Sequence, residues 1–213
     1  MLTSSNLLDI DKITSLETIT KELERLKYVL TKNEMRQLLI FNNAYLVVTS
    51  NIQKASKEGY FDNPKFIEEL TISFACYYFQ VVNQTKDDIE LPKAWDTLNK
   101  VAQKKATPNF ILLLLGANAH INHDLILVLT KLREDKETGN LLQDFIKMDK
   151  ILMKSGREII ATFSEPSKQL DFLKRRVIFM YYRPVMYMIR FWRLRAWTHY
   201  LYIKRIDNKI INA

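Results

Sequence analysis

The segment TPNFILLLLGANAHINHDLILVLTKL, Thr107 to Leu132, sets the strongest limit on what this chain can fold into. Phe110 to Leu115 would be apolar on every side of a helix, so this helix cannot lie with one face in water. Thr107 can cap its start, and Pro108 suits the first helical position, where its missing N–H costs nothing. We therefore predict a central helix that is enclosed by other helices.

The middle of this predicted helix holds a cluster of polar side chains: Asn118, His120, Asn122, His123 and Asp124. A buried element carries such groups only if each finds a partner. His120 and Asp124 lie one turn apart, so the carboxylate could fix the tautomer of the imidazole or stabilise its charged form, as an orienting acid does for a general base. The cluster marks a site, but it does not name a reaction.

Helical spacing at 100° per residue divides this region between two faces. One face carries Gly116, His120, His123, Asp124 and Leu127, and the opposite face carries Asn118 and Asn122. Under a functional interpretation, His120 and Asp124 are the catalytic pair. The expected substrate-binding residues are Asn118, Asn122, His123, Tyr45 and Asn42. Under a structural interpretation, the polar groups bond to surrounding helices, and we give the two interpretations equal weight.

A metal site is not expected. His120 and His123 are three residues apart, whereas the H-E-x-x-H type of site needs a spacing of four, a catalytic Glu and a third ligand. Only one further histidine, His199, could complete it. We predict no bound metal and no cofactor.

The run Gly116–Leu125, GANAHINHDL, resembles the signature of a bacterial family of helical proteins of unknown function, Asn-Ala-His-Ile-Asn-x-Asp-Leu. Looser matches are FNNAYLVVT at 41–49, FDNP at 61–64, FA at 74–75 with YF at 78–79, and LPKAW at 91–95, so the resemblance covers roughly Met35 to Met153. It implies a shared helical fold and site but no reaction. Because His123 occupies the variable position, the resemblance gives more weight to His120, Asn122 and Asp124.

The fold class is predicted as all-α, a single compact bundle of about seven helices in one domain, 1–213, around the helix 107–132. Only 4 Gly and 5 Pro occur in 213 residues, and the apolar spacing is helical nearly throughout. The other expected helices are Ser15–Leu30 with Thr14 and Glu17 as a capping box, Asn33–Ala55, 64–83, a short helix after Pro92, Leu141–Phe163 with a kink at Gly156, and 164–209.

The cellular location is predicted from what the chain lacks. Its single cysteine, Cys76, excludes an internal disulfide, and the first residues do not resemble a signal peptide. The run 110–132 is long enough to span a bilayer, but its polar cluster would be very costly in lipid. We expect a cytoplasmic protein, with a peripheral position at the inner membrane as the second option.

The segment 164–209 is compositionally distinct. From Lys168 to Lys209, eleven Lys or Arg face two Asp, a balance of +9 against +8 for the whole chain. Arg176, Arg183 and Arg190 recur every seven residues among many aromatic residues and Met, and they are the candidate anion-binding residues. We expect Pro184 to kink or divide the helix. Three roles compete: arginines paired with acids inside the bundle, an anionic membrane surface, and nucleic acid, which we rank in that order.

Two classes of function follow. The first is an enzyme that acts on a small, largely apolar or amphipathic molecule in an enclosed pocket, with His120 and Asp124 as the acid/base pair. The second is a non-catalytic module that binds lipid or a partner through the basic aromatic segment. No Gly-rich phosphate loop or nucleophile elbow occurs, which argues against common nucleotide-binding and serine-hydrolase functions.

Asp144 or Asp149 could complete the site with His120 and Asp124, although we expect both to be exposed. We also expect at least two of the three arginines to be paired, and weak binding to vesicles. The sequence does not set the oligomeric state.

Overall fold

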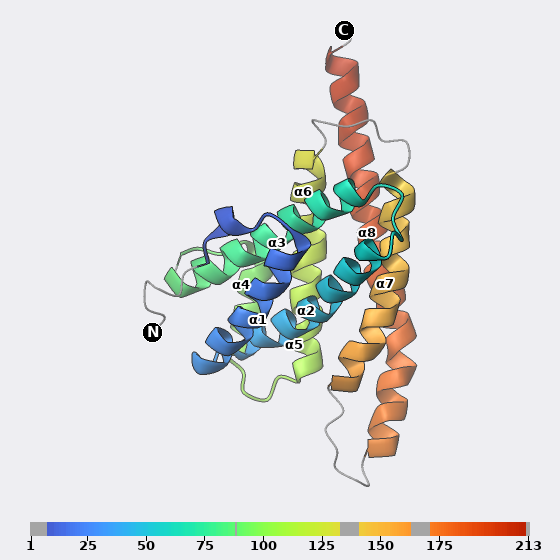
Figure 1. The fold of residues 1–213 in the computed structure, drawn as a ribbon. Helices are drawn as coiled ribbons and strands as arrows, with labels where there is room; N and C mark the ends of the chain where they lie inside the picture. Colours follow the sequence, from blue (N-terminus) through green and yellow to red (C-terminus); the bar gives the residue numbers. More distant parts are fainter. Residues whose placement is uncertain (1–7, 88, 133–140, 163–170, 212–213) are drawn as a thin grey trace.

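The computed structural model describes residues 8–87, 89–132, 141–162 and 171–211, and in these residues it contains helices and no strand. The helices are α1 (Leu16–Lys32), α2 (Arg36–Lys57), α3 (Pro64–Asp87), α4 (Lys93–Ala102), α5 (Asn109–Ala119), α6 (Leu125–Lys131), α7 (Leu141–Thr162) and α8 (Asp171–Ile211). A π-helical turn, His120–Asp124, joins α5 to α6 without a break, so the two form one rod. The all-α prediction of about seven packed helices is confirmed (Figure 1).

The first helix begins one residue later than the predicted capping box requires. Ser15, and not Thr14, is the N-cap of α1: its hydroxyl accepts a hydrogen bond from the backbone N–H of Thr18, and the Thr18 hydroxyl accepts one from the N–H of Ser15. Thr18 therefore plays the part that we expected Glu17 to play. The predicted inner stripe of this helix is buried: Leu16, Ile19, Leu23, Leu26 and Leu30.

The boundaries of α3 follow local capping chemistry at one end and differ from the prediction at the other. The side chain of Asn63 accepts from the N–H of Phe66, so Asn63–Pro64 opens the helix as expected. At its other end the helix runs to Asp87, past the predicted end near Asn83. The polar residues after Asn83 continue the helix because polar side chains are compatible with its solvent side.

The central rod lies between α4 on one side and the pair α7–α8 on the other, in contact with α2 (Figure 1). Its start differs from the prediction, since Pro108 is the N-cap and α5 begins at Asn109. The Thr107 hydroxyl donates to the carbonyl of Val101 and so does not cap this helix. Instead, Arg36 of α2 fixes the start by donating to the Thr107 carbonyl and to the Asn109 side chain.

The rod is long and apolar enough, over Asn109–Lys131, to cross a membrane, and it is the one helix of the described residues that meets this criterion. In the structure, 44% of its most apolar window is buried against other helices. Core helices meet the same criterion by length and composition, so the observation leaves the cellular location open.

Helices α7 and α8 form an antiparallel pair along one side of the molecule (Figure 1). Gly156 allows them to lie close together, because a Cβ there would stand 2.8 Å from Sδ of Met186 and 3.0 Å from the Tyr182 ring. We predicted a kink at Gly156, but its role is this close approach. Pro184 lies inside α8 and does not divide it. The predicted helix start at 164–166 lies outside the described residues.

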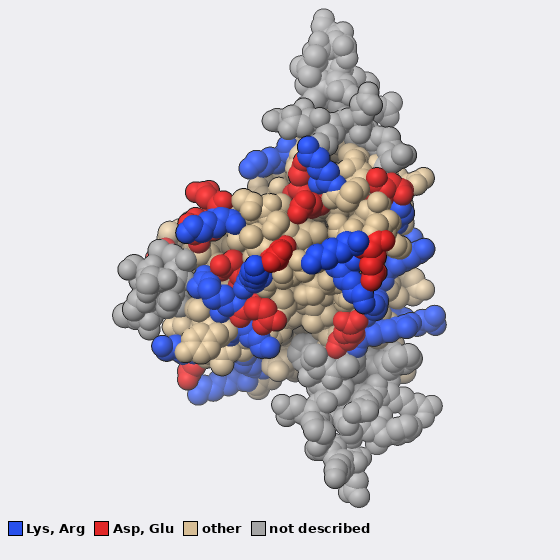
Figure 2. Space-filling view, in the orientation of Figure 1, with Lys and Arg blue, Asp and Glu red and all other residues tan. Residues whose placement is uncertain are grey.

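On the face shown in Figure 2, lysine and arginine side chains alternate with acidic ones over α1, α2 and α3. Helix α1 contains two ion pairs one helical turn apart, Lys21 with Glu17 and Arg25 with Glu22. Because both signs are mixed, this face offers no broad field of one charge to a charged partner.

Candidate functional site

A cavity of about 160 Å³ lies between the central rod and helices α2, α3, α7 and α8. Aliphatic and aromatic side chains make up most of its wall: Phe41, Val48, Leu70, Phe74, Leu113, Phe145, Met148, Met186 and Ile189 are among them. The few polar groups at the wall include Tyr45, His120 and Arg193. A cavity of this size takes a molecule of about one benzene ring.

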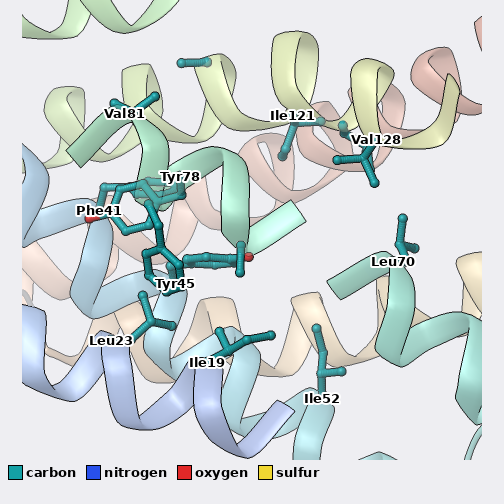
Figure 3. Close-up of a cluster of buried hydrophobic side chains, with 14 of the residues drawn as sticks. Ile19, Leu23, Phe41, Tyr45, Ile52, Leu70, Tyr78, Val81, Ile121 and Val128 are labelled. Atoms are coloured by element: carbon teal, nitrogen blue, oxygen red, sulfur yellow. The ribbon is translucent and has the colours of Figure 1, made fainter. Parts of the chain in front are cut away.

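Aromatic rings surround the imidazole of His120. Phe74 stacks on it with ring centroids 3.5 Å apart and an interplanar angle of 11°. Tyr45 and Phe41 meet it edge-on, at centroid distances of 4.9 and 5.4 Å. Figure 3 shows Phe41, Tyr45 and Tyr78 gathered beside one another between α2 and α3, where their centroids lie 5.0 to 5.8 Å apart. The aromatic rings therefore fix the plane of the imidazole.

Asp124 holds the other side of His120. Nδ1 of His120 lies 2.8 Å from Oδ2 of Asp124, and Nδ1 of His123 lies 2.7 Å from Oδ1. The indole N–H of Trp95 donates to the same carboxylate, at 3.3 and 3.2 Å from its two oxygens. Asp124 is 1% exposed, so it has lost its hydrogen bonds to water, and these three partners replace them.

The protonation states follow from these contacts. Burial raises the pKa of Asp124, but the hydrogen bonds from His120, His123 and Trp95 outweigh burial, and the net pKa lies below its usual value. Burial lowers the pKa of His120, against the opposing effect of the bond to Asp124. Near neutral pH the carboxylate is therefore ionised and the imidazole neutral, with its one proton on Nδ1.

The remaining nitrogen, Nε2 of His120, is buried and has no hydrogen-bond partner among the described residues. The same holds for the hydroxyl of Tyr45. Both side chains line the cavity. An unprotonated nitrogen can accept a hydrogen bond or a proton, and a phenol can donate or accept a hydrogen bond. The cavity is therefore an apolar volume, and two residues of its wall each carry a buried polar atom without a partner among the described residues.

The comparisons with known proteins assign the chain to a family but give no activity. Residues 13–209 match a family described as a family of unknown function, DUF5995. The chain belongs to this family. The match extends the resemblance predicted for Met35 to Met153 in both directions, and it leaves the signature motif and the bacterial origin as predictions. No curated protein and no solved structure matches this member of DUF5995.

Of the polar residues expected to bind substrate, this DUF5995 protein brings only Tyr45 to the cavity wall. The Asn42 side chain donates to the carbonyl of Leu23 at 2.8 Å and thus ties α2 to α1. Asn122 donates to the Asn118 side chain at 2.8 Å and accepts from Arg195 at 2.9 Å. These three contacts are structural, and the asparagines lie outside the cavity lining.

His123 is also outside the cavity lining, and its side chain is 37% exposed. The hydrogen bond to Asp124 raises its pKa. His123 therefore connects the buried carboxylate to the surface. In the described part of the chain, no group of three or more His, Cys, Asp or Glu side chains is arranged to hold a metal ion.

Asp144 and Asp149, which we expected to be exposed or to join His120, are buried elsewhere. Asp144 accepts from the backbone N–H groups of Asp62 and Asn63 before α3. Asp149 pairs with Arg193, which is 4% exposed and also donates to the carbonyl of Phe145 at 2.9 Å. Burial of these carboxylates is possible because each has donors from distant parts of the chain.

The three arginines of the sevenfold repeat do not act as a set. Arg190 pairs with Asp149 at 3.3 Å, although its side chain is 51% exposed. Arg183 is exposed, and no acid of the described residues pairs with it. The side chain of Arg176 lies outside the described residues. Among the described residues, the buried arginine is Arg193, which the repeat does not contain. Of the three arginines, only Arg190 is seen to pair with an acid in the described residues, so the expectation of at least two pairs stays a prediction.

Reasoning from the sequence also missed most of the cavity wall. The sequence predicts no role at the site for Phe74, and α7 and α8 contribute residues from far along the chain, such as Phe145, 88 positions beyond the end of α2, and Met186. One signal could have indicated that α8 is near: its inner face, with Tyr182, Met186 and Ile189, has the spacing of a buried helix face.

Proposed function

We propose that this protein binds a small, largely apolar molecule that carries one hydrogen-bond donor, and that His120 accepts that donor and acts on it as a general base. The observation that carries the proposal is the buried, unpartnered Nε2 of His120, a residue that lines an apolar cavity. A buried acceptor without a partner costs stability, and a functional role is a common reason for such a group.

Asp124 supports the chemistry in two ways. By accepting a hydrogen bond from Nδ1–H it keeps the imidazole in the tautomer whose lone pair is on Nε2. As an anion 2.8 Å away it also stabilises the imidazolium that forms when Nε2 takes a proton. The face of Phe74, which stacks on the imidazole, also favours its cationic form, because the face of an aromatic ring is negative. The hydroxyl of Tyr45 is the second group that can orient the molecule.

The test uses two probes of nearly equal shape, phenol and toluene, of which only phenol carries a donor. Binding is measured by calorimetry and by shifts of assigned NMR signals from the cavity wall. We expect phenol to bind about ten-fold more tightly than toluene, since a hydrogen bond of this kind contributes about 1 to 1.5 kcal/mol. In the His120→Phe variant, which keeps a ring, the preference for phenol should disappear.

The matched control is His123→Phe. It removes one donor from Asp124, as His120→Phe does, but at a residue that does not line the cavity. It should keep the preference for phenol. Equal affinity for the two probes in the unaltered protein, or a preference that persists in His120→Phe, would contradict the proposal.

A further inference from the structure

Helix α8 exposes a row of large side chains on the face opposite the cavity. Met180, Tyr187, Phe191 and Tyr202 are 58 to 65% exposed, and we call these four residues the outer stripe. Their spacings of seven, four and eleven residues place them along one line of the helix. At 1.5 Å per residue this line is about 33 Å long. Single exposed apolar residues are ordinary, whereas several of them along one line of a helix indicate a binding surface.

The other face of α8 carries a separate set of apolar residues. Tyr182, Met186 and Ile189 line the cavity, and Trp197 and Tyr200 are buried. The outer stripe is therefore separate from the residues by which α8 packs into the core. Its aromatic residues lie on the part of the helix that the rest of the molecule does not cover.

Arginines accompany the outer stripe on both sides. Helical spacing puts Arg183 and Arg190 about 60 to 80° to one side and Arg195 about 60° to the other. All three are exposed. Arg190 and Arg195 reach neighbours in α7 and the π-helical turn, but Arg183 pairs with no acid of the described residues. Between Asp171 and Asp207, α8 contains no acidic residue.

We propose that the outer stripe docks the protein on an anionic membrane surface. A convex row of Phe, Tyr and Met can enter the boundary between headgroups and acyl chains, while long arginine side chains on its flanks reach the lipid phosphates. Tyrosine suits this boundary because it has an apolar ring and a polar tip. A second copy of the chain is a poorer partner, because two stripes face to face would bring arginines against arginines. This replaces our expectation of weak vesicle binding.

The test is flotation of the full chain with vesicles of phosphatidylcholine alone or mixed in equal parts with phosphatidylglycerol. We expect binding to the mixed vesicles, and binding should weaken as salt is added. Phe191→Ser should weaken binding roughly ten-fold by removing apolar contact. Arg183→Gln should weaken it about five-fold, the effect of one cation near an anionic surface.

Two matched controls distinguish an effect of the outer stripe from nonspecific effects of exposed aromatic residues and of net charge. Tyr28→Ser removes an aromatic side chain that is 70% exposed on α1, away from α8 (Figure 1). Lys65→Gln removes one exposed cation from α3. Neither control should change vesicle binding, and circular dichroism melts should show that all four variants fold as the parent does.

Three outcomes would overturn the proposal. The first is no binding to mixed vesicles at low salt. The second is an equal effect of Phe191→Ser and Tyr28→Ser. The third is a parent protein that does not bind vesicles but sediments as a dimer, together with a Phe191→Ser variant that sediments as a monomer. That result would assign the outer stripe to contact between copies of the chain.

Discussion

Asp124 shows how one residue can organise a buried polar site. Its two oxygens accept from His120, His123 and Trp95, which come from the π-helical turn and from α4. The contact with His120 could be predicted from a spacing of four residues on a helix. The contact with Trp95 could not, because the two residues are 29 positions apart and only packing of α4 on the rod brings them together.

Asp124→Asn should lower the free energy of unfolding by about 2 to 4 kcal/mol. The amide has one acceptor oxygen in place of two and turns its N–H₂ group toward a donor, so at least one buried donor is left without a partner. Chemical denaturation measures the change. Asp96→Asn is the control, because Asp96 pairs with Lys100 at an exposed position and its loss should change stability by less than about 0.5 kcal/mol.

Tyr45→Phe should raise the melting temperature by about 2 to 4 °C, because it removes a buried hydroxyl that has no partner among the described residues. Tyr78→Phe is the matched comparison: its hydroxyl donates to the carbonyl of Leu38 at 3.3 Å, so its loss should lower the melting temperature. If Tyr45→Phe also lowers the melting temperature, the hydroxyl of Tyr45 has a partner that compensates for its burial.

Among the elements, the close contact of α2 with α5 depends on Gly116. A Cβ at this position would stand 2.7 Å from Cδ2 and 3.2 Å from Cβ of Phe41. Because the clash reaches the base of the Phe41 side chain, a change of rotamer cannot relieve it. Phe41 also meets the ring of His120, so the distance between these helices sets the shape of the cavity.

Gly116→Ala should therefore destabilise the protein by about 1 to 3 kcal/mol, although alanine is the better helix former by about 1 kcal/mol. It should also weaken phenol binding in the calorimetric assay. Ser50→Ala, at an exposed position of α2, is the control for helix propensity and should be neutral or slightly stabilising. A Gly116→Ala variant as stable as the parent would show that α2 and α5 can move apart freely.

The pair α7–α8 is held by a buried ion pair between Asp149 and Arg193. Arg193→Met should cost about 3 kcal/mol or more, because Asp149 keeps only the half-exposed Arg190 as its cationic partner. The double variant Arg193→Met with Asp149→Leu should recover most of that loss, since it leaves no buried charge unpaired. Urea unfolding of the parent, both single variants and the double variant completes the cycle, and an additive result would mean that the two side chains are not coupled.

Element boundaries show where reasoning from the sequence succeeds. Apolar spacing predicted the helices and the inner stripe of α1 because burial of one face imposes that period. It misplaced the caps at Thr14 and Thr107, since several neighbouring residues could cap and only the packed chain selects one. The burial of Asp144 was missed because its partners, the N–H groups of Asp62 and Asn63, lie more than eighty positions away.

At the scale of the whole molecule, stability should depend on pH through two histidines with opposite sign. Burial lowers the pKa of His120 below 6.5, so on acidification the unfolded chain takes up a proton before the folded one does. The contribution of His120 to the free energy of unfolding is therefore complete above about pH 6.5 and is lost as the pH falls through the folded pKa. The hydrogen bond to Asp124 raises the pKa of His123, so its contribution is complete below about pH 6.5 and is lost as the pH rises through that pKa.

The variants His120→Phe and His123→Phe separate the two contributions. Between about pH 8 and pH 5, the loss of stability on acidification should be smaller than in the parent for His120→Phe and larger for His123→Phe. NMR titration of the imidazole C–H signals should show one pKa below and one above the ordinary value. Two histidines that titrate together would contradict the assigned roles.

The fold class followed from composition and period alone, because a chain with so few glycines and prolines and such regular apolar spacing has no other economical way to bury its core. A pocket beside His120 was expected under the enzyme hypothesis, but its wall did not follow from the sequence, because it is formed where helices from all parts of the chain fail to fill the space between them. Whether a cavity forms depends on side-chain packing, which a pattern of apolar residues leaves undetermined.

The π-helical turn has a consequence for how sequences of this family should be compared. Before the turn the inward residues include Leu112, Gly116 and His120, and a regular helix would continue with His123 and Leu127. In the structure the inward residues are instead Asp124 and Val128, and Leu127 is 40% exposed. The turn thus behaves as a one-residue insertion that leaves both flanking helices in place. A one-residue gap in an alignment at this point would therefore mark the loss of the π-helical turn and not a shortened helix.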